Sequence, residues 1–392
     1  MTETHLSTLL HESATDLTIP DAPAGAIVAS AHRARRRRRT TFGGGLALAA
    51  LAIAGTGLAA THLGTEPTVL APATAPSNDG WAVAQGSTIH LGTGATAKVP
   101  GQVKAMYYTS AGTLVRVGKT PYTDAPDSNY WLVKPDGSTI DFSLSLGDRK
   151  PGTDPTLPYL AYAQKDGDSS HWQVVLRDVR TGKVATTVDI TGSFTWGGWN
   201  APPAALSGDH VYVGMDDATL EVDWRTGDVR KATGLDRSRM PTVAGGHEIT
   251  GDDGDFAIKD AHTGTLLLDL SDKGQAPGNR VAVGKNRSFD DVWPTLSPDG
   301  RYTVLMPTAS CNEAGTCHFD KPTAEAYDLA SGKRSTIDLK YGEFGWTPTG
   351  RLLEVSNSVV DSCDVATHQC TATKVRLDGS GPIRISGNDN ES

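Results

Sequence analysis

DVRTG at residues 178–182 is the first clear copy of a turn motif that recurs through most of the chain. The motif is Asp, two variable residues, Thr or Ser, and Gly. Gly supplies the positive φ that a tight hairpin needs, and the Asp carboxylate can accept hydrogen bonds from the turn itself. Further copies are DWRTG (223–227), DAHTG (260–264) and DLASG (328–332), with weaker ones ending at Gly94, Gly137 and Gln369. The motif predicts β-hairpins at a period of about 45 residues.

A second series of glycine turns interleaves with the first. Its members are TSAG (Gly112), QKDG (Gly167), LSGD (Gly208), GDDG (Gly254), SPDG (Gly300) and TPTG (Gly350). Short apolar runs such as HVYVGM and TLEVDW separate the turns and alternate as β-strands do. Two hairpin turns in each period imply four strands, and four-stranded units at this period indicate a β-propeller.

The two ends of the repeat region predict how the ring closes. WAVAQ, STIHL and TAKVP, between Trp81 and Pro100, supply only three strands for the first blade. The last strand-like run, Pro382–Ser386, has no blade of its own. If it pairs into the first blade as the innermost strand, it removes two exposed sheet edges. We therefore predict an all-β fold, a seven-bladed β-propeller over residues 79–388.

Two segments carry a resemblance to a known family. LSPDGRYTVL (296–305) and AEAYDLASGK (324–333) resemble the WD40-like repeat of TolB-type propellers. The resemblance implies the propeller fold and assigns no catalytic residue.

Ahead of the repeats lies an arginine block followed by an apolar stretch. The arginines are Arg33, Arg35, Arg36, Arg37, Arg38 and Arg39, and residues 40–61 carry no charge. As a helix this stretch spans about 33 Å, enough to cross a hydrocarbon core of about 30 Å. Arginine-rich flanks stay in the cytoplasm. We expect a cytoplasmic tail (1–39), a transmembrane signal anchor (40–61), a Pro/Thr/Ala-rich linker (62–78), and a propeller outside the cell membrane.

Three other interpretations of the apolar stretch compete with the signal anchor. Twin-arginine export needs a Phe one position closer to the arginine pair than Phe42 is. A soluble buried helix would be apolar on every face and directly follow six charges. A cleaved signal peptide is compatible with the small residues Leu58-Ala59-Ala60, but its charged leader would be far longer than such signals have. Cleavage stays open. The tail resembles the N-termini of many actinobacterial membrane proteins, some of which look like membrane partners of sigma factors, and contact with a sigma factor also stays open.

Charge limits the choice of partner. The chain has a formal net charge of −9, although the first 39 residues are net positive. The part expected outside the membrane is therefore acidic, which argues against nucleic acid as its partner.

The four cysteines form two close pairs, Cys311 with Cys317 and Cys363 with Cys370. Exported chains retain disulfides, so we predict two local bridges. A metal site is the alternative, but neither pair has zinc-ligand spacing.

The sequence shows no catalytic constellation. It lacks a G-x-S-x-G motif, and its histidines show no ligand spacing, so we expect no catalytic residue, metal or cofactor. Trp196, Trp199 and Trp293 are the candidate contacts for an unknown extracytoplasmic protein or glycan; the alternative is packing between blades. The expected function is non-enzymatic, a binding, sensor or scaffold module. The alternative is an exported hydrolase or lyase, lactonase-like, with a channel metal.

Overall fold

The structure, a computed structural model, describes the repeat region with short gaps. The described residues are 80–122, 127–146, 150–167, 170–195, 200–233, 235, 241–251, 256–270, 292–307, 309–311, 317–319, 323–341, 343–377, 379 and 381–386. The expected tail with its arginine block, the expected span 40–61 and the linker lie outside them. Within the described residues, no helix is long and apolar enough to span a membrane.

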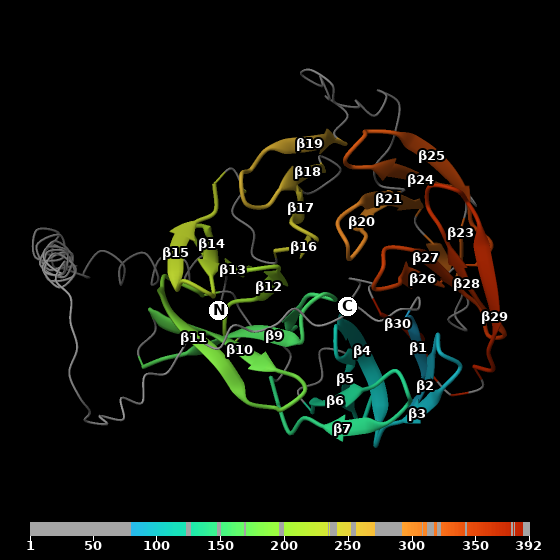
Figure 1. Cartoon of the computed structure of the whole chain (residues 1–392), viewed down its shortest axis with the longest axis horizontal. Coiled ribbons are helices and arrows are strands. Elements are labelled where there is room, and N and C mark those ends of the chain that lie inside the picture. Colours follow the sequence, from blue (N-terminus) through green and yellow to red (C-terminus); the bar gives the residue numbers. More distant parts are fainter. Residues whose placement is uncertain are drawn as a thin grey trace, which may run out of the picture. The chain divides into compact units, whose positions relative to one another are not determined.

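The unit from Leu70 to Ser392 contains seven antiparallel four-stranded sheets, arranged as the blades of a ring (Figure 1). The prediction of an all-β, seven-bladed propeller is confirmed. Neighbouring blades touch mainly through their inner strands, as β12 does with β8 and β16.

The strands of the first four blades lie between Ala82 and Lys231, with the exception of one strand from the end of the chain. Blade 1 consists of β30 (Ile383–Ile385), β1 (Ala82–Gln85), β2 (Thr88–Leu91) and β3 (Thr96–Lys98). Blade 2 consists of β4 (Gln102–Thr109), β5 (Gly112–Gly118), β6 (Asn129–Val133) and β7 (Thr139–Asp141). Blade 3 consists of β8 (Gly152–Thr153), β9 (Tyr159–Lys165), β10 (His171–Asp178) and β11 (Val184–Thr191). Blade 4 consists of β12 (Ala204–Ser207), β13 (His210–Gly214), β14 (Thr219–Asp223) and β15 (Asp228–Lys231).

The remaining blades complete the ring. Blade 5 consists of β16 (Val243–Ala244), β17 (His247–Thr250), β18 (Ala257–Asp260) and β19 (Leu266–Asp269). Blade 6 consists of β20 (Val292–Leu296), β21 (Tyr302–Pro307), β24 (Thr323–Asp328) and β25 (Arg334–Asp338). Blade 7 consists of β26 (Glu343–Trp346), β27 (Leu352–Val355), β28 (Val359–Cys363) and β29 (Cys370–Lys374). A separate two-stranded hairpin, β22 (Ala309–Cys311) and β23 (Cys317–Phe319), interrupts blade 6.

The last strand closes the ring as the sequence predicts. β30 pairs antiparallel with β1, with Ile383 opposite Gln85 and Ile385 opposite Val83. It is the innermost strand of blade 1 and also contacts β4 and β26 of the flanking blades. Ile385 is 7% exposed and belongs to the apolar cluster between blades 7 and 1.

The Asp-x-x-Thr/Ser-Gly motif forms the turn between the two outer strands of a blade. In blade 3 the N–H of Gly182 donates to the Asp178 carbonyl at 2.8 Å, and the Asp178 carboxylate accepts from the N–H of Arg180. The same bonds recur at Asp223, Asp260, Asp328 and Asp364. His368 takes the place of the glycine in the turn of blade 7, with a φ of 60° that only Gly adopts without cost.

The second series of glycines comprises two kinds of turn rather than one. Gly112, Gly208, Gly300 and Gly350 lie between the first and second strands of their blades, whereas Gly167 lies between the second and third. Gly254 lies outside the described residues. A blade built from four consecutive strands has three hairpin turns, so glycine marks whichever turn needs a positive φ, and the spacing alone does not separate them.

One of the two predicted disulfides is present. Cys363 is bonded to Cys370, across the turn between β28 and β29. Cys311 and Cys317 are direct partners in the register of β22 and β23, and their bridge stays a prediction.

Apolar clusters fill six of the seven blade interfaces among the described residues. They lie between blades 1 and 2, 2 and 3, 3 and 4, 5 and 6, 6 and 7, and 7 and 1. A fully buried Val or Leu contributes about 1.5–3 kcal/mol, so these clusters hold the ring together. The interface between blades 4 and 5 has no such cluster within the described ranges.

We expect deletion of residues 381–392 to lower the thermal unfolding midpoint sharply or to cause aggregation. The deletion exposes an edge of β1, and loss of Ile385 burial alone costs about 1.5–3 kcal/mol. Deletion of residues 387–392 is the matched control, because it leaves β30 in place. Equal melting of the two truncations would contradict closure by β30.

Candidate functional site

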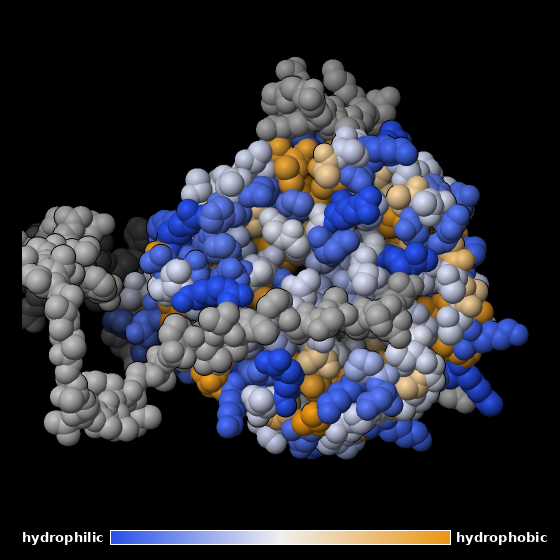
Figure 2. All heavy atoms as spheres, viewed as in Figure 1, coloured by the Kyte–Doolittle hydropathy of each residue, from blue (hydrophilic) through white to orange (hydrophobic). Residues whose placement is uncertain are grey.

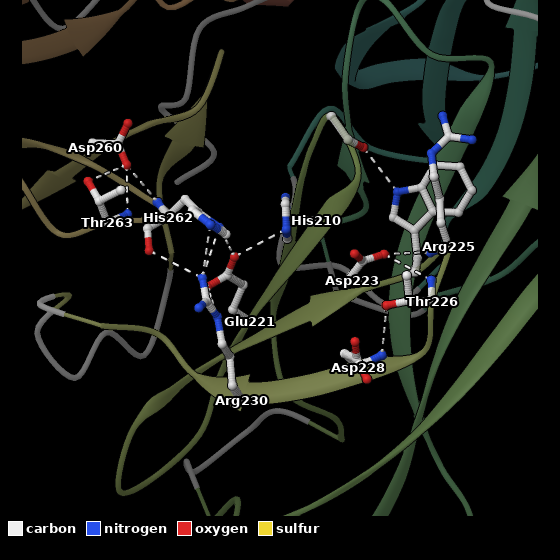
Figure 3. A network of polar contacts seen from close by, with 12 residues as sticks. His210, Glu221, Asp223, Arg225, Thr226, Asp228, Arg230, Asp260, His262 and Thr263 are labelled. Atoms are coloured by element: carbon white, nitrogen blue, oxygen red, sulfur yellow. Dashed lines mark hydrogen bonds and ion pairs between the residues drawn. The ribbon is translucent and has the colours of Figure 1, made fainter. Parts of the chain in front are cut away.

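The interface between blades 4 and 5 has no apolar cluster among the described residues, whereas each of the other six interfaces has one. We use the name blade 4–5 interface for His210, Tyr212, Glu221 and Arg230 of blade 4 with His262 of blade 5. Figure 3 shows His210, Glu221, Arg230 and His262 of this group. Nearer the ring centre, the N–H of Gly246 in blade 5 donates to Ser207 Oγ in blade 4 at 2.8 Å.

Strand register places these side chains on one face of blade 4. Tyr212 on β13 lies opposite Glu221 on β14, which lies opposite Arg230 on β15. Alternate residues in a strand point to opposite faces. Val211 and Val222 therefore point the other way, into the apolar cluster shared with blade 3.

Glu221 is the centre of the group. Its side chain is only 1% exposed. Oε1 lies 2.5 Å from Nδ1 of His262 and 3.3 Å from Nε2 of His210. Oε2 accepts a hydrogen bond from Nε of Arg230 at 2.9 Å and lies 2.8 Å from Nη2 of the same guanidinium. Both oxygens thus face nitrogen groups, which offsets the cost of burying the carboxylate.

The turn motif of blade 5 brings His262 to the site. His262 is the second residue after Asp260, whose carboxylate accepts hydrogen bonds from the N–H groups of His262 and Thr263 (Figure 3). Burial acts to raise the pKa of Asp260, but the donors on Thr263 outweigh it and the pKa falls below its usual value. Asp260 therefore stays ionised near neutral pH and keeps the turn fixed.

Arg230 and Glu221 compete for the same nitrogen of His262. Arg230 Nη2 lies 2.9 Å from Nδ1 of His262, the atom that also lies 2.5 Å from Glu221. A neutral imidazole nitrogen either donates or accepts, so it cannot serve both partners at once. The His210 and His262 rings are 4.9 Å apart between centroids.

Tyr212 lies behind the carboxylate. Burial raises the pKa of its phenol, and the negative charge of Glu221 acts in the same direction. Tyr212 therefore stays neutral at physiological pH. Glu248 on β17 is also fully buried on the blade 5 side, so both faces of the interface carry a carboxyl group.

The group has the donor set of a metal site. One carboxylate oxygen and two imidazole nitrogens lie within 4.8 Å of one another. Imidazole suits zinc, copper, iron and nickel, and two His with one Glu form zinc sites that leave a coordination position open.

The sequence expectation of no metal ligands missed this group. His210 lies on β13, Glu221 on β14 and His262 in the turn that follows β18, so the three donor residues have no regular spacing in the sequence. The turn motif itself carried a signal, because the residue two before the motif's Asp is Leu176, Glu221, Ile258, Ala326 and Ser362 in successive blades. Only Glu221 is charged among these five, and Leu176, Ile258 and Ala326 lie in apolar clusters.

The predicted tryptophan contacts remain predictions. Trp196 and Trp199 lie outside the described residues. Trp293 belongs to β20, and the structure describes its backbone but not its side chain. Nearby aromatic residues pack between blades instead. Trp346 is fully buried, and Phe194 meets Trp172 edge-on at 5.9 Å between centroids.

Comparisons with known proteins give likenesses to solved structures only. No family model matches the chain, and no curated protein matches it. Apo AztD from Citrobacter koseri matches with a TM-score of 0.45 and 11% identity, covering 78% of this chain and 97% of that one. The Dos1 propeller gives 0.41 and 13%, covering 78% and 86%, and TolB from Acinetobacter baumannii gives 0.34 and 10%, covering 78% and 65%. The fold assignment rests on the strand pairing, not on these likenesses.

We expect Arg230→Met to lower the free energy of unfolding by about 1–2 kcal/mol, because it leaves the buried Glu221 without its cation. This loss is smaller than the loss on breaking a fully buried ion pair, because the Arg230 side chain is half exposed. Adding Glu221→Leu should restore most of the loss, since apolar replacement of a buried pair is often neutral or stabilising.

Urea unfolding at neutral pH measures both changes. Arg334→Met in blade 6 is the matched control, because Arg334 pairs with Glu325 across two outer strands but contacts no histidine in the described structure. A double variant no more stable than Arg230→Met would show that the pair is needed for stability itself.

Proposed function

We propose that this protein is a membrane-anchored propeller that binds an extracytoplasmic protein or glycan and acts as a sensor or scaffold rather than an enzyme. The observation that carries the proposal is the group of His210, Glu221 and His262 at the blade 4–5 interface, which is the one interface without an apolar cluster among the described residues. A buried charge cluster contributes less stability than apolar packing, and proteins accept such a cost mainly at functional sites.

The chemistry of Glu221 favours binding over catalysis. Arg230 holds one carboxylate oxygen through a hydrogen bond from Nε and an ion pair with Nη2, and two histidines face the other oxygen. Both carboxylate oxygens of Glu221 are therefore engaged by nitrogen groups of the protein rather than open to a substrate. His262 and Arg230 are about half exposed, so a partner can reach the positive side of the group.

The rest of the ring surface supports a platform role. On the face in Figure 2, polar side chains predominate among the described atoms, and apolar ones gather in small separate groups. The proposed anchor, residues 40–61 after the arginine block, would hold this platform outside the cell membrane.

The orientation is tested by labelling with a membrane-impermeant thiol reagent in whole cells. A cysteine in place of Ser7 should be protected, because the arginine block keeps the tail inside, whereas one in place of the exposed Thr181 should react. The parent chain gives the background. Labelling at Ser7 without lysis would overturn the orientation.

Binding at the blade 4–5 interface is tested by photo-cross-linking in cells of the source organism. A photoreactive residue in place of Thr263, next to His262, should give a discrete adduct with a partner. Thr181 holds the equivalent position in the turn of blade 3 and should not give that adduct. The Thr263 adduct should also disappear when Arg230→Gln is added. Equal adducts at both positions, or none at Thr263, would contradict the proposal.

A further inference from the structure

We infer that His210, Glu221 and His262 bind one divalent transition-metal ion of the zinc type, which joins blade 4 to blade 5. The inference rests on the proposed function, because it names the chemistry of the same interface. It starts from three donor groups that converge on one point, one of them a carboxylate with 1% exposure.

The two distances from Glu221 Oε1 to the histidine nitrogens fit a tetrahedral ion after a small shift, and all three donor atoms lie within 4.8 Å of one another. With zinc–ligand bonds of about 2.0–2.1 Å, two donors in a tetrahedral site lie about 3.3 Å apart. Glu221 Oε1 and His210 Nε2 already have this separation, 3.3 Å. Nδ1 of His262 lies 2.5 Å from Oε1 and must retreat by about 0.8 Å to reach it. The His262 side chain is half exposed, so the ring has room to move outward.

The donor set selects the class of ion. Calcium and magnesium need six or more oxygen ligands or several retained waters, and this site offers one buried carboxylate. Two imidazoles and one carboxylate suit zinc and its neighbours, with a fourth position open to water or to a donor from the partner.

Arg230 acts as the opposing cation. Its guanidinium occupies Oε2 and lies 2.9 Å from Nδ1 of His262, so it neutralises Glu221 when no metal is bound. When Nδ1 of His262 and Oε1 of Glu221 coordinate the metal, Arg230 can still hold Oε2 of Glu221 and so fix the orientation of the carboxylate. The positive charge also opposes the arriving ion, so Arg230 weakens the affinity and keeps binding reversible.

The metal would fasten the one interface that has no apolar cluster in the described structure. His210 and Glu221 belong to blade 4 and His262 to blade 5, so coordination bridges the two blades. An ion that binds the folded ring and not the unfolded chain raises the thermal midpoint.

The test uses the purified full-length chain, metal-free, with Zn²⁺ alone as the probe. We expect one equivalent of zinc by elemental analysis after desalting and a rise in the thermal unfolding midpoint that Ca²⁺ does not reproduce. His210→Ala and His262→Ala should each weaken zinc affinity by more than about tenfold, since even outer partners of metal ligands contribute that much. His171→Ala, which removes an exposed histidine in blade 3, should bind as the parent chain does.

Arg230→Gln supplies a test in the opposite direction. Removing the cation should raise zinc affinity about tenfold, while Arg334→Gln should leave it unchanged. A site made by chance surface histidines would not respond to Arg230. Absence of saturable zinc binding, or binding that survives the combined His210→Ala and His262→Ala change, would overturn the inference.

The outcome is separable from that of the proposed function. If the chain forms the Arg230-dependent Thr263 adduct but binds no zinc, the metal inference is wrong and the proposed binding function is still supported. Zinc binding without any adduct would leave a metal site and remove the partner.

Discussion

The pairing of β30 with β1 is the contact on which the rest of the ring depends. It joins residues at the two ends of the repeat region, with Ile385 opposite Val83, and makes the last strand part of the first blade. Without it, β1 would present an unpaired edge, and the cluster between blades 7 and 1 would lose Ile385. Because the ring is closed, each blade has two fixed neighbours, and all seven interfaces must be filled.

Most of the fold could be predicted from the sequence because its signals are local. The Asp-x-x-Thr/Ser-Gly motif satisfies its own backbone within five residues, so it marks a hairpin wherever it occurs. The closing strand was predictable by elimination, since one blade lacked a strand and one strand lacked a blade. The second glycine series was less informative, because Gly167 and Gly208 both supply a positive φ but lie in different turns of their blades.

The site was hidden for the opposite reason. Glu221 and His262 are 41 positions apart, and only the packing of blade 4 on blade 5 brings them to 2.5 Å. Each has a structural reason to be where it is, one in an alternating strand and the other inside a turn motif. The informative comparison is between blades: a charged residue at a position that is otherwise apolar or small.

An arginine–glutamate pair alone does not make this interface unusual. Blade 6 has a similar pair, Glu325 with Arg334 at 2.6 Å, beside Tyr327 of the cluster between blades 5 and 6. There the pair lies at the margin of an apolar interface and Tyr327 donates a hydrogen bond to the carboxylate. In blade 4 the carboxylate lies in the interface itself and faces histidines from both blades. Apolar clusters at the other six interfaces and the closed ring fix the positions of blades 4 and 5, so the groups between these two blades are held in place without an apolar cluster of their own among the described residues.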